Sequence, residues 1–238
     1  MKAIILCAGK GTRMLINYPK SLIKTNNNKS LLKNIFLNFK KSGFKKNDII
    51  LATGYKHNLI KKEIGSGPKY IFNKKFGSTN MVYTLMSSIK NLDEDIILSY
   101  ADLVYDYKNI VNLKNDNKDF VTLVDKKWMS IWKKKNKLES DSETLKIKNN
   151  KITELGKKTK SIKDIDARYV GVTKIKKSVL NDIRNFFFKE LKKNSWKFYK
   201  IDMTNFFNIL IKNGYIIESK QILKNWNEFD DAIDLDRN

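Results

Sequence analysis

The residues best suited to chemistry form a glycine-rich stretch near the amino terminus. It reads Ala8-Gly9-Lys10-Gly11-Thr12-Arg13, and Pro19-Lys20 follows shortly after. Glycines let backbone N–H groups approach a phosphate chain closely, while Arg13 and Lys20 supply positive charge. The glycine order matches neither a Walker loop nor the GxGxxG dinucleotide fingerprint. The stretch therefore predicts a phosphate-binding turn, and the alternative is an ordinary strand-to-helix turn.

Two aspartates are candidates for binding a metal ion. Asp102 follows an apolar run at residues 95–100, and open α/β sheets place their ligands at the carboxyl ends of such strands. Asp230 lies far away in the sequence. If the fold brings the two together, their carboxylates can hold Mg²⁺ beside nucleotide phosphates. Alternatively the two aspartates cap a loop and a helix, and Asp231 competes with Asp230 for the metal.

Apolar runs and helical spacing predict the elements that position these residues. In the first half of the chain, helices are expected at residues 30–42 and 80–89. Strands are expected at residues 2–7, 48–53, 70–73, 95–100 and 120–124. This alternation is typical of βα units that build a mostly parallel sheet covered on both faces. We therefore expect a three-layer α/β fold.

The second half of the chain has a different pattern. A hairpin is expected around Asn149-Asn150, because short apolar runs flank this pair. Further elements are expected as strands at residues 169–175 and 215–219 and as helices at residues 178–192 and 204–213. No repeat or long linker interrupts the chain, so we expect a single domain over residues 1–238.

The basic residues are strongly biased towards lysine. The chain has 238 residues and a formal net charge of +23, and of its 48 basic residues only Arg13, Arg168, Arg184 and Arg237 are arginines. Scattered lysines form a solvated surface that binds polyanions weakly, whereas nucleic-acid recognition favours the guanidinium fork. We therefore expect small anionic substrates and no nucleic-acid partner. A basic RNA-binding module is the alternative from another class.

The cysteine and histidine content and the amino-terminal apolar run bear on the cellular compartment of the protein. A single cysteine and a single histidine exclude a disulfide framework and a Cys/His zinc cluster. The apolar run at residues 3–8 is too short for a signal peptide or a membrane span. We expect a cytoplasmic protein with no membrane partner. Cys7 lies within a strand and His57 in a polar loop, so neither is assigned a catalytic role.

Several segments together resemble the nucleotidyltransferases that activate sugar phosphates and phosphoalcohols. The opening signature of that family is a strand followed by LxAGxGTR and then PK, which matches Leu6 to Arg13 and Pro19-Lys20. Further matches follow in order along nearly the whole chain: Asn73, FGSTNMVYTL at 76–85, YAD at 100–102, GKK at 156–158, YVG at 169–171 and NEFD at 227–230. The FGSTNMVYTL segment and the short chain are closer to the phosphocholine cytidylyltransferase branch. One departure is the short spacer of residues 14–18.

The resemblance implies a Rossmann-like, glycosyltransferase-A-like fold and a CTP-dependent cytidylyltransferase that needs Mg²⁺. The acceptor would be a small phosphorylated or phosphonylated compound, such as phosphocholine, an aminoalkylphosphonate or a phosphoamide like phosphoglutamine. An acceptor oxygen attacks the α-phosphorus and pyrophosphate leaves in line, so no protein nucleophile is needed. The alternative within enzymes is a sugar-1-phosphate nucleotidyltransferase that uses UTP, GTP or dTTP. The family also implies a role in cell-surface polysaccharide biosynthesis, and a homodimer is a candidate assembly.

The resemblance also implies roles for individual residues. The catalytic candidates are Lys20, Arg13, Asp102 and Lys157, and the metal ligands are Asp102 and Asp230. The nucleotide would be bound by Leu6, Ala8, Gly9, Lys10, Gly11, Thr12, Arg13, Lys20, Ser78, Thr79, Asn80 and Asp102. Two of these assignments have simple alternatives. Asn80 is also a suitable helix cap, and Lys157 lies in a lysine-rich run that is otherwise solvated.

The candidates for acceptor binding are Trp128, Lys157, Tyr169 and Glu228. An aromatic face attracts a quaternary ammonium, so Trp128 with Glu228 would suit phosphocholine. Trp128 and Trp132 are equally suited to filling a core beneath a lid. No second aromatic residue completes a choline cage, because Met203 and Thr204 stand where one is expected. An acceptor with a primary amine or an amino acid is therefore equally compatible with the sequence.

Overall fold

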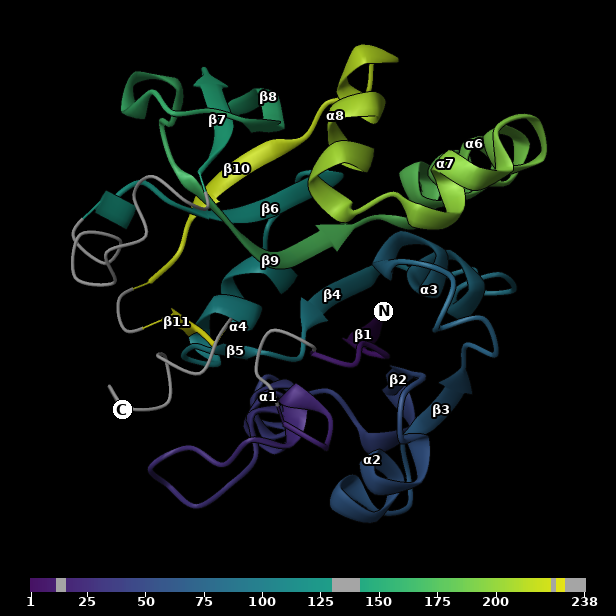
Figure 1. The fold of residues 1–238 in the computed structure, drawn as a ribbon. Helices are drawn as coiled ribbons and strands as arrows, with labels where there is room; N and C mark the ends of the chain where they lie inside the picture. The colour runs from purple at the N-terminus through teal and green to yellow at the C-terminus, as the bar shows by residue number, and fades with distance from the viewer. Residues whose placement is uncertain (12–15, 130–141, 224–225, 230–238) are drawn as a thin grey trace.

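The computed structural model describes residues 1–11, 16–129, 142–223 and 226–229 (Figure 1). A nine-stranded sheet forms its centre, in the order β3-β2-β1-β4-β9-β6-β10-β8-β7. The strands of this sheet are β1 (Lys2–Cys7), β2 (Ile49–Thr53), β3 (Lys69–Phe72), β4 (Ile96–Tyr100), β6 (Phe120–Asp125), β7 (Glu143–Lys148), β8 (Lys151–Lys158), β9 (Arg168–Ile175) and β10 (Glu218–Gln221). Within it only β8 and β9 run against the other strands. The expected mostly parallel sheet is therefore confirmed.

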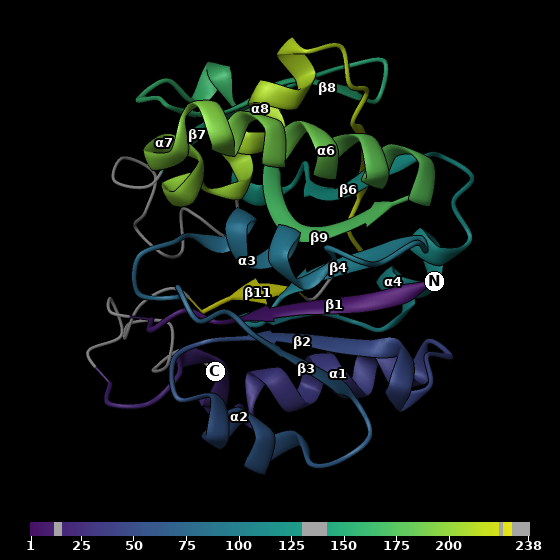
Figure 2. The same ribbon diagram turned by 90° about the vertical axis from the view of Figure 1, so that its right-hand side faces the viewer.

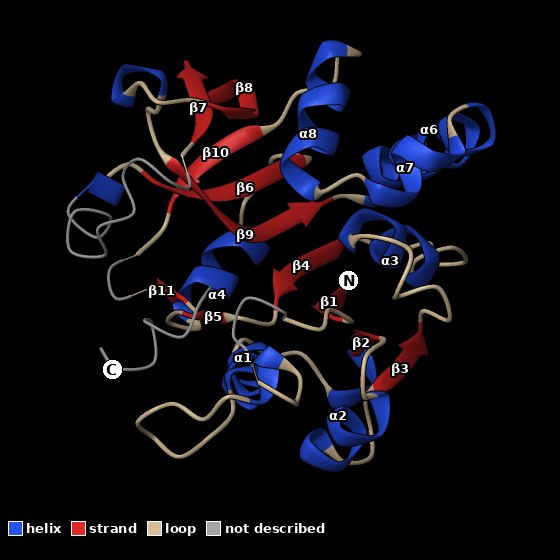
Figure 3. Cartoon of the chain, in the orientation of Figure 1, coloured by secondary structure: helices blue, strands red, loops and turns tan. Residues whose placement is uncertain are grey.

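Helices cover both faces of this sheet, as Figures 2 and 3 show. One apolar core lies under α1 (Leu31–Lys41), α2 (His57–Ile64) and α4 (Lys108–Lys114). The other lies under α3 (Met81–Ser88), α6 (Lys177–Lys193), α7 (Ser195–Lys200) and α8 (Met203–Lys212). Strand β1 divides its side chains between them, with Ile5 in the first core and Ile4 in the second, because alternate residues of a strand face opposite sides. The three expected layers are present.

Most elements lie within one or two residues of their expected positions. Helix α1 begins after Ser30, whose hydroxyl accepts a hydrogen bond from the Lys33 amide. The expected hairpin has φ angles of 51° and 61° at Asn149 and Asn150, as a tight turn between right-twisted strands requires.

Three deviations have physical causes. The expected strand at residues 215–219 becomes β10 (Glu218–Gln221), because the Tyr215 amide still closes the end of α8 on the Leu210 carbonyl. The polar stretch around His57 is helical in α2, where Ile60 and Ile64 alone are buried. Helix α4 is similarly short and polar. Such helices are stabilised by packing on the sheet more than by their own periodicity.

In the ranges that the structure describes, no helix combines the length and the apolar content that crossing a bilayer requires.

Candidate active site

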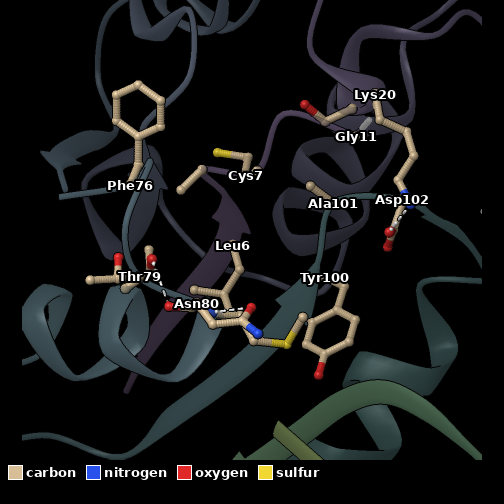
Figure 4. A pocket seen from close by; sticks show the side chains of 15 residues that line it. Leu6, Cys7, Gly11, Lys20, Phe76, Thr79, Asn80, Tyr100, Ala101 and Asp102 are labelled. Carbon is tan, nitrogen blue, oxygen red and sulfur yellow. Dashed lines mark hydrogen bonds and ion pairs between the residues drawn. The ribbon is translucent and has the colours of Figure 1, made fainter. Parts of the chain in front are cut away.

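A cavity of about 310 Å³ opens at the carboxyl ends of β1 and β4 (Figure 4). The chain runs from β1 to β2 and β3 on one side, and then returns to β4 on the other side of β1. Such a reversal of strand order leaves a crevice between the two strands, which is where open α/β sheets bind ligands. The cavity is lined by Leu6, Cys7, Ala8, Gly9, Gly11, Lys20, Ser21, Phe76, Thr79, Asn80, Met81, Thr84, Tyr100, Ala101 and Asp102.

The glycine-rich turn lies against Lys20. Gly11 has φ +64°, and a Cβ there would come within 2.6 Å of the Lys20 Cβ, so only glycine fits this position without strain. A Cβ at Gly9 would have no atom within 4 Å, so this glycine borders open space. Lys10 is exposed, with its Nζ 5.9 Å from the centre of the Tyr55 ring. Two residues of the predicted set, Thr12 and Arg13, lie outside the described residues.

Lys20 and Asp102 form an ion pair at one side of the cavity (Figure 4). The Lys20 Nζ lies 2.7 Å from the Asp102 Oδ2, and the two side chains are only 14% and 20% exposed. The other carboxylate oxygen, Oδ1, is buried and has no hydrogen-bond partner among the described residues. A buried acceptor without a donor costs stability, so this oxygen is better suited to a ligand that the free protein lacks.

The second predicted metal ligand, Asp230, lies outside the described residues. The described residue before it, Phe229, donates its amide to the Asp102 carbonyl over 3.0 Å. This contact continues a short antiparallel ladder between β5 (Leu103–Val104) and β11 (Asn227–Glu228), which lie side by side in Figure 1. The chain therefore returns to Asp102 from a segment that is distant in sequence. Among the described residues, no group of three or more His, Cys, Asp and Glu side chains is arranged to hold a metal.

The loop before α3 forms another wall of the cavity. Asn80 is the N-cap of α3, because its Oδ1 accepts from the Met81 amide, and its Nδ2 donates to the Lys200 carbonyl at 3.1 Å. Thr79 lines the cavity and is held by the buried Asn73 amide at 3.0 Å. Ser78 is exposed and bonded to the Lys75 carbonyl, outside the cavity lining. The helix-cap alternative for Asn80 thus holds, although the residue also borders the cavity.

A second cavity of about 210 Å³ adjoins the first. Met81 and Tyr100 line both cavities, so they form the boundary between them. The other lining residues are Glu143, Thr144, Leu145, Leu155, Gly156, Ala167, Arg168, Tyr169, Asp202, Met203, Thr204 and Glu228. Two of the four acceptor candidates, Tyr169 and Glu228, are therefore placed in one cavity beside the first.

The two tyrosines of this region are neutral hydrogen-bonding groups near pH 7. Burial raises the pKa of Tyr169 to about 12. Burial also raises the pKa of Tyr100 well above its ordinary value, and the negative charges of Asp102 and Glu228 add to the effect. Both hydroxyls can therefore donate to a phosphate or carboxylate without repelling it.

The other two acceptor candidates lie elsewhere. Trp128 is 2% exposed and belongs to the core under α1, which favours the packing alternative, and its acceptor role stays a prediction. Trp132 lies outside the described residues. Lys157 is half-exposed and pairs with Glu154, while its neighbour Gly156 faces the second cavity. Gly156 has φ +82° and the pairing of β7 with β8 shifts register beside it, so regular alternation is interrupted here and the lysine pairs with Glu154.

Three charged residues of the second cavity were missed by reasoning from the sequence: Arg168, Glu143 and Asp202. Their cavity depends on β9 lying between β4 and β6 and on the start of α8, which local patterns do not specify. A signal for Arg168 did exist, because arginine is rare in this lysine-rich chain. Where nearly all basic residues are lysines, an arginine indicates a position that needs the planar guanidinium fork.

Replacing Gly171 tests the boundary between the cavities. Gly171 has φ +85°, and an added Cβ would lie 2.6 Å from the Tyr100 Cδ2. We expect Gly171→Ala to lower the free energy of unfolding by about 2 to 4 kcal/mol and to raise the KM of both substrates by displacing Tyr100. Denaturant unfolding and steady-state kinetics measure the two effects.

Gly65→Ala is a matched control for this variant. Gly65 has φ +83°, but a Cβ there would have no atom within 4 Å. It therefore shares the backbone strain and lacks the ring contact, so a loss of about 1 to 2 kcal/mol with unchanged KM values is expected. Equal losses and equal KM values in both variants would contradict the role given to Tyr100.

The chain resembles known proteins along nearly its whole length, although no family model matches it. It is 32% identical to the CTP:phosphoglutamine cytidylyltransferase of Campylobacter jejuni, over 99% of this chain and 98% of that protein. Among solved structures it resembles the CTP:phosphocholine cytidylyltransferase of Streptococcus pneumoniae, with a TM-score of 0.72, 20% identity and coverage of 99% and 96%. It also resembles a UDP-glucose pyrophosphorylase in complex with UDP-glucose, with a TM-score of 0.71, 13% identity and coverage of 96% and 92%. At these identities the two structures establish a shared fold.

Proposed function

The chain belongs to the nucleotidyltransferase family and has its glycosyltransferase-A-like α/β fold, and from this premise we propose that it transfers CMP from CTP to a small phosphorylated acceptor. One observation carries the proposal. A glycine-lined cavity holds the Lys20–Asp102 pair, and a second polar cavity adjoins it across Met81 and Tyr100. Two adjoining sites that meet at Tyr100 suit a reaction between two phosphate-bearing substrates.

The proposed reaction needs positioning and charge neutralisation. A phosphoryl oxygen of the acceptor attacks the α-phosphorus of CTP and forms a new P–O bond. The bond from that phosphorus to the bridging oxygen breaks, and the electron pair leaves with pyrophosphate. Lys20 offers its ammonium to the phosphates, and the backbone amides of the glycine-rich turn supply further donors. The Thr79 side of the cavity and the Ala8–Gly9 backbone would hold the nucleoside.

The residues present fit the Mg²⁺ that the family implies. The buried Oδ1 of Asp102 lacks a partner among the described residues, and hard carboxylate oxygens are the ligands that Mg²⁺ prefers. We propose that Asp102 and Asp230 hold the ion. When bound, Mg²⁺ neutralises the triphosphate and polarises its oxygens. The contact between Phe229 and Asp102 supports this pairing of distant residues.

The choice of CTP and of a phosphoglutamine-like acceptor rests on the relative from Campylobacter jejuni. A screen of pyrophosphate release tests it, with CTP, UTP, GTP and dTTP against phosphoglutamine, phosphocholine and glucose 1-phosphate. We expect release from CTP only when a phosphorylated non-sugar acceptor and Mg²⁺ are both present. Release from UTP with glucose 1-phosphate would instead support the sugar alternative. RNA binding that persists at physiological salt, without any transfer, would support the binding module.

A further inference from the structure

The side-chain oxygens that are buried without a hydrogen-bond partner gather at the two cavities. Among the described residues there are three: the Ser21 hydroxyl, the Asp102 Oδ1 and the Tyr169 hydroxyl. Ser21 and Asp102 line the first cavity, and Tyr169 lines the second. Because buried polar groups normally have partners, such oxygens at a cavity indicate a polar ligand that the free protein lacks. Asp102 is assigned to the metal above, whereas Ser21 has no part in the function proposed above.

Ser21 differs from other buried serines of the described chain. It is 6% exposed, and a serine in such a position usually donates to a nearby backbone carbonyl. Other buried serine hydroxyls are bonded in this way or to a side chain, as at Ser30, Ser42, Ser88 and Ser99. Ser42 is a close comparison, because it is also 6% exposed and its hydroxyl donates to the Asn38 and Tyr107 carbonyls. The bond that Ser21 lacks is therefore a particular feature of this position.

A short 3₁₀ helix, η2 (Lys20–Leu22), holds Ser21 at the wall of the first cavity. Two backbone hydrogen bonds of 2.8 and 3.0 Å close this turn. The residue that follows it, Ile23, is buried in a small core with Leu31 and Phe229. The backbone of Ser21 is thus fixed on both sides, and a rotation about its Cα–Cβ bond is enough to turn the hydroxyl towards a ligand.

The neighbours of Ser21 indicate which part of a nucleotide it would meet. Lys20 precedes it in the chain, and Gly11 of the glycine-rich turn lies against Lys20. Figure 4 shows Lys20 and Gly11 on one side of the cavity, with Thr79 and Asn80 on the other. The ammonium and the amides of the turn are donors, so they suit anionic oxygens. A hydroxyl beside them can donate to the same phosphate chain, while the nucleoside is assigned to the opposite wall.

Resting on the proposed function, we propose that Ser21 binds the triphosphate of the nucleotide, with its hydroxyl donating a hydrogen bond to a phosphate oxygen beside Lys20. The phosphate is the partner that this hydroxyl lacks in the free protein, so binding removes a cost in stability that the free protein carries. Hydrogen bonds to charged oxygens are also stronger than those between neutral groups. Ser21 therefore favours ligands with a phosphate chain over the unphosphorylated nucleoside.

Ser21→Ala removes the hydroxyl and tests this role without turnover. With Mg²⁺ present, calorimetric titration measures the binding of CTP and of inorganic pyrophosphate, and an NMR titration measures that of cytidine. We expect the variant to bind CTP and pyrophosphate about 10- to 100-fold more weakly, as for the loss of a hydrogen bond to a charged group. Cytidine has no phosphate, so its affinity should change by less than about twofold. Ser21→Cys, which nearly keeps the side-chain size but has only a weak donor, should show the same pattern.

The unfolding temperature of the free protein gives a second readout. Removal of a buried hydroxyl without a partner should leave the Tm of Ser21→Ala equal to or above that of the wild type. Ser42→Ala is the matched control, because it removes an equally buried hydroxyl that is bonded and lies outside the lining of both cavities. Its Tm should fall by about 2 to 4 °C, and its affinity for CTP should equal that of the wild type.

Three results would overturn the proposal: wild-type affinity for CTP and pyrophosphate in Ser21→Ala, an equal loss of affinity for cytidine, or a fall in Tm as large as in Ser42→Ala. The last result would mean that the hydroxyl is bonded within the free protein. Failure of the proposed function has a different signature. In that case CTP yields no pyrophosphate with any phosphorylated acceptor, while the titration with inorganic pyrophosphate still decides whether Ser21 binds a phosphate chain.

Discussion

Asp102→Asn is expected to lower kcat by about 10³-fold while the protein keeps its fold. The substitution preserves size and removes the anionic oxygen that a hard metal ion requires. A 10³-fold loss corresponds to roughly 4 kcal/mol of transition-state stabilisation. The backbone carbonyl of residue 102 still accepts from Phe229, so the ladder of β5 and β11 is retained.

Stability should respond differently from activity in this variant. The wild-type Oδ1 is buried without a partner among the described residues, and a neutral amide removes that buried negative charge. The loss of the Lys20 ion pair opposes this gain. The two effects partly cancel, so we expect a Tm within a few degrees of the wild type. Such a small change is typical when a residue serves activity and does not add to stability.

Asp106→Asn is the control for this prediction. Asp106 is exposed, lies four residues further on, and only caps the start of α4 by accepting from the Lys108 amide. Its replacement should leave kcat unchanged. Calorimetric titration with Mn²⁺ and CTP adds a readout besides turnover, and Asp102→Asn should lose the metal-dependent part of nucleotide binding. Near-normal turnover or unchanged metal binding in Asp102→Asn would refute the metal role.

The first half of the fold could be predicted because its signals are local. Buried parallel strands are continuous apolar runs, and β1 begins and ends at the expected residues 2 and 7. The same reasoning placed Asp102 at the carboxyl end of its strand, and in the structure it lines one cavity with residues of the glycine-rich turn. Each of the two strands that carry this site, β1 and β4, is a separate apolar run, so the local sequence identifies both strands and the residues at their ends. The two strands are neighbours in the sheet, so those residues lie together.

The acceptor side could not be predicted in the same way. Strand β9 runs antiparallel between β4 and β6, and no local pattern indicates that insertion. It is this pairing that brings Arg168 to the carboxyl end of β4. Trp128 illustrates a different difficulty, because an aromatic residue next to lysines is compatible with both a binding surface and a core, and only its burial favours the core.

Lys20→Ala is expected to raise the KM for CTP about tenfold and to lower kcat by about 10² to 10³-fold. The Lys20 ammonium lies in the cavity 2.7 Å from Asp102, and close contact with Gly11 fixes its backbone against the phosphate-binding turn. A charge in this position acts on the phosphates both before and during bond breaking, which is why both constants should change. Lys24→Ala, on an exposed side chain four residues further on, should change neither.

The double variant Lys20→Ala/Asp102→Asn separates catalysis from stability. Lys20→Ala alone leaves a mostly buried carboxylate without this ion pair, so we expect it to lose about 1 to 3 kcal/mol of unfolding free energy. Adding Asp102→Asn removes that carboxylate and should restore most of the loss, while activity stays low. Recovery of activity together with stability would mean that Lys20 acts only by holding the fold, and the assignment of its ammonium to the phosphates would then be wrong.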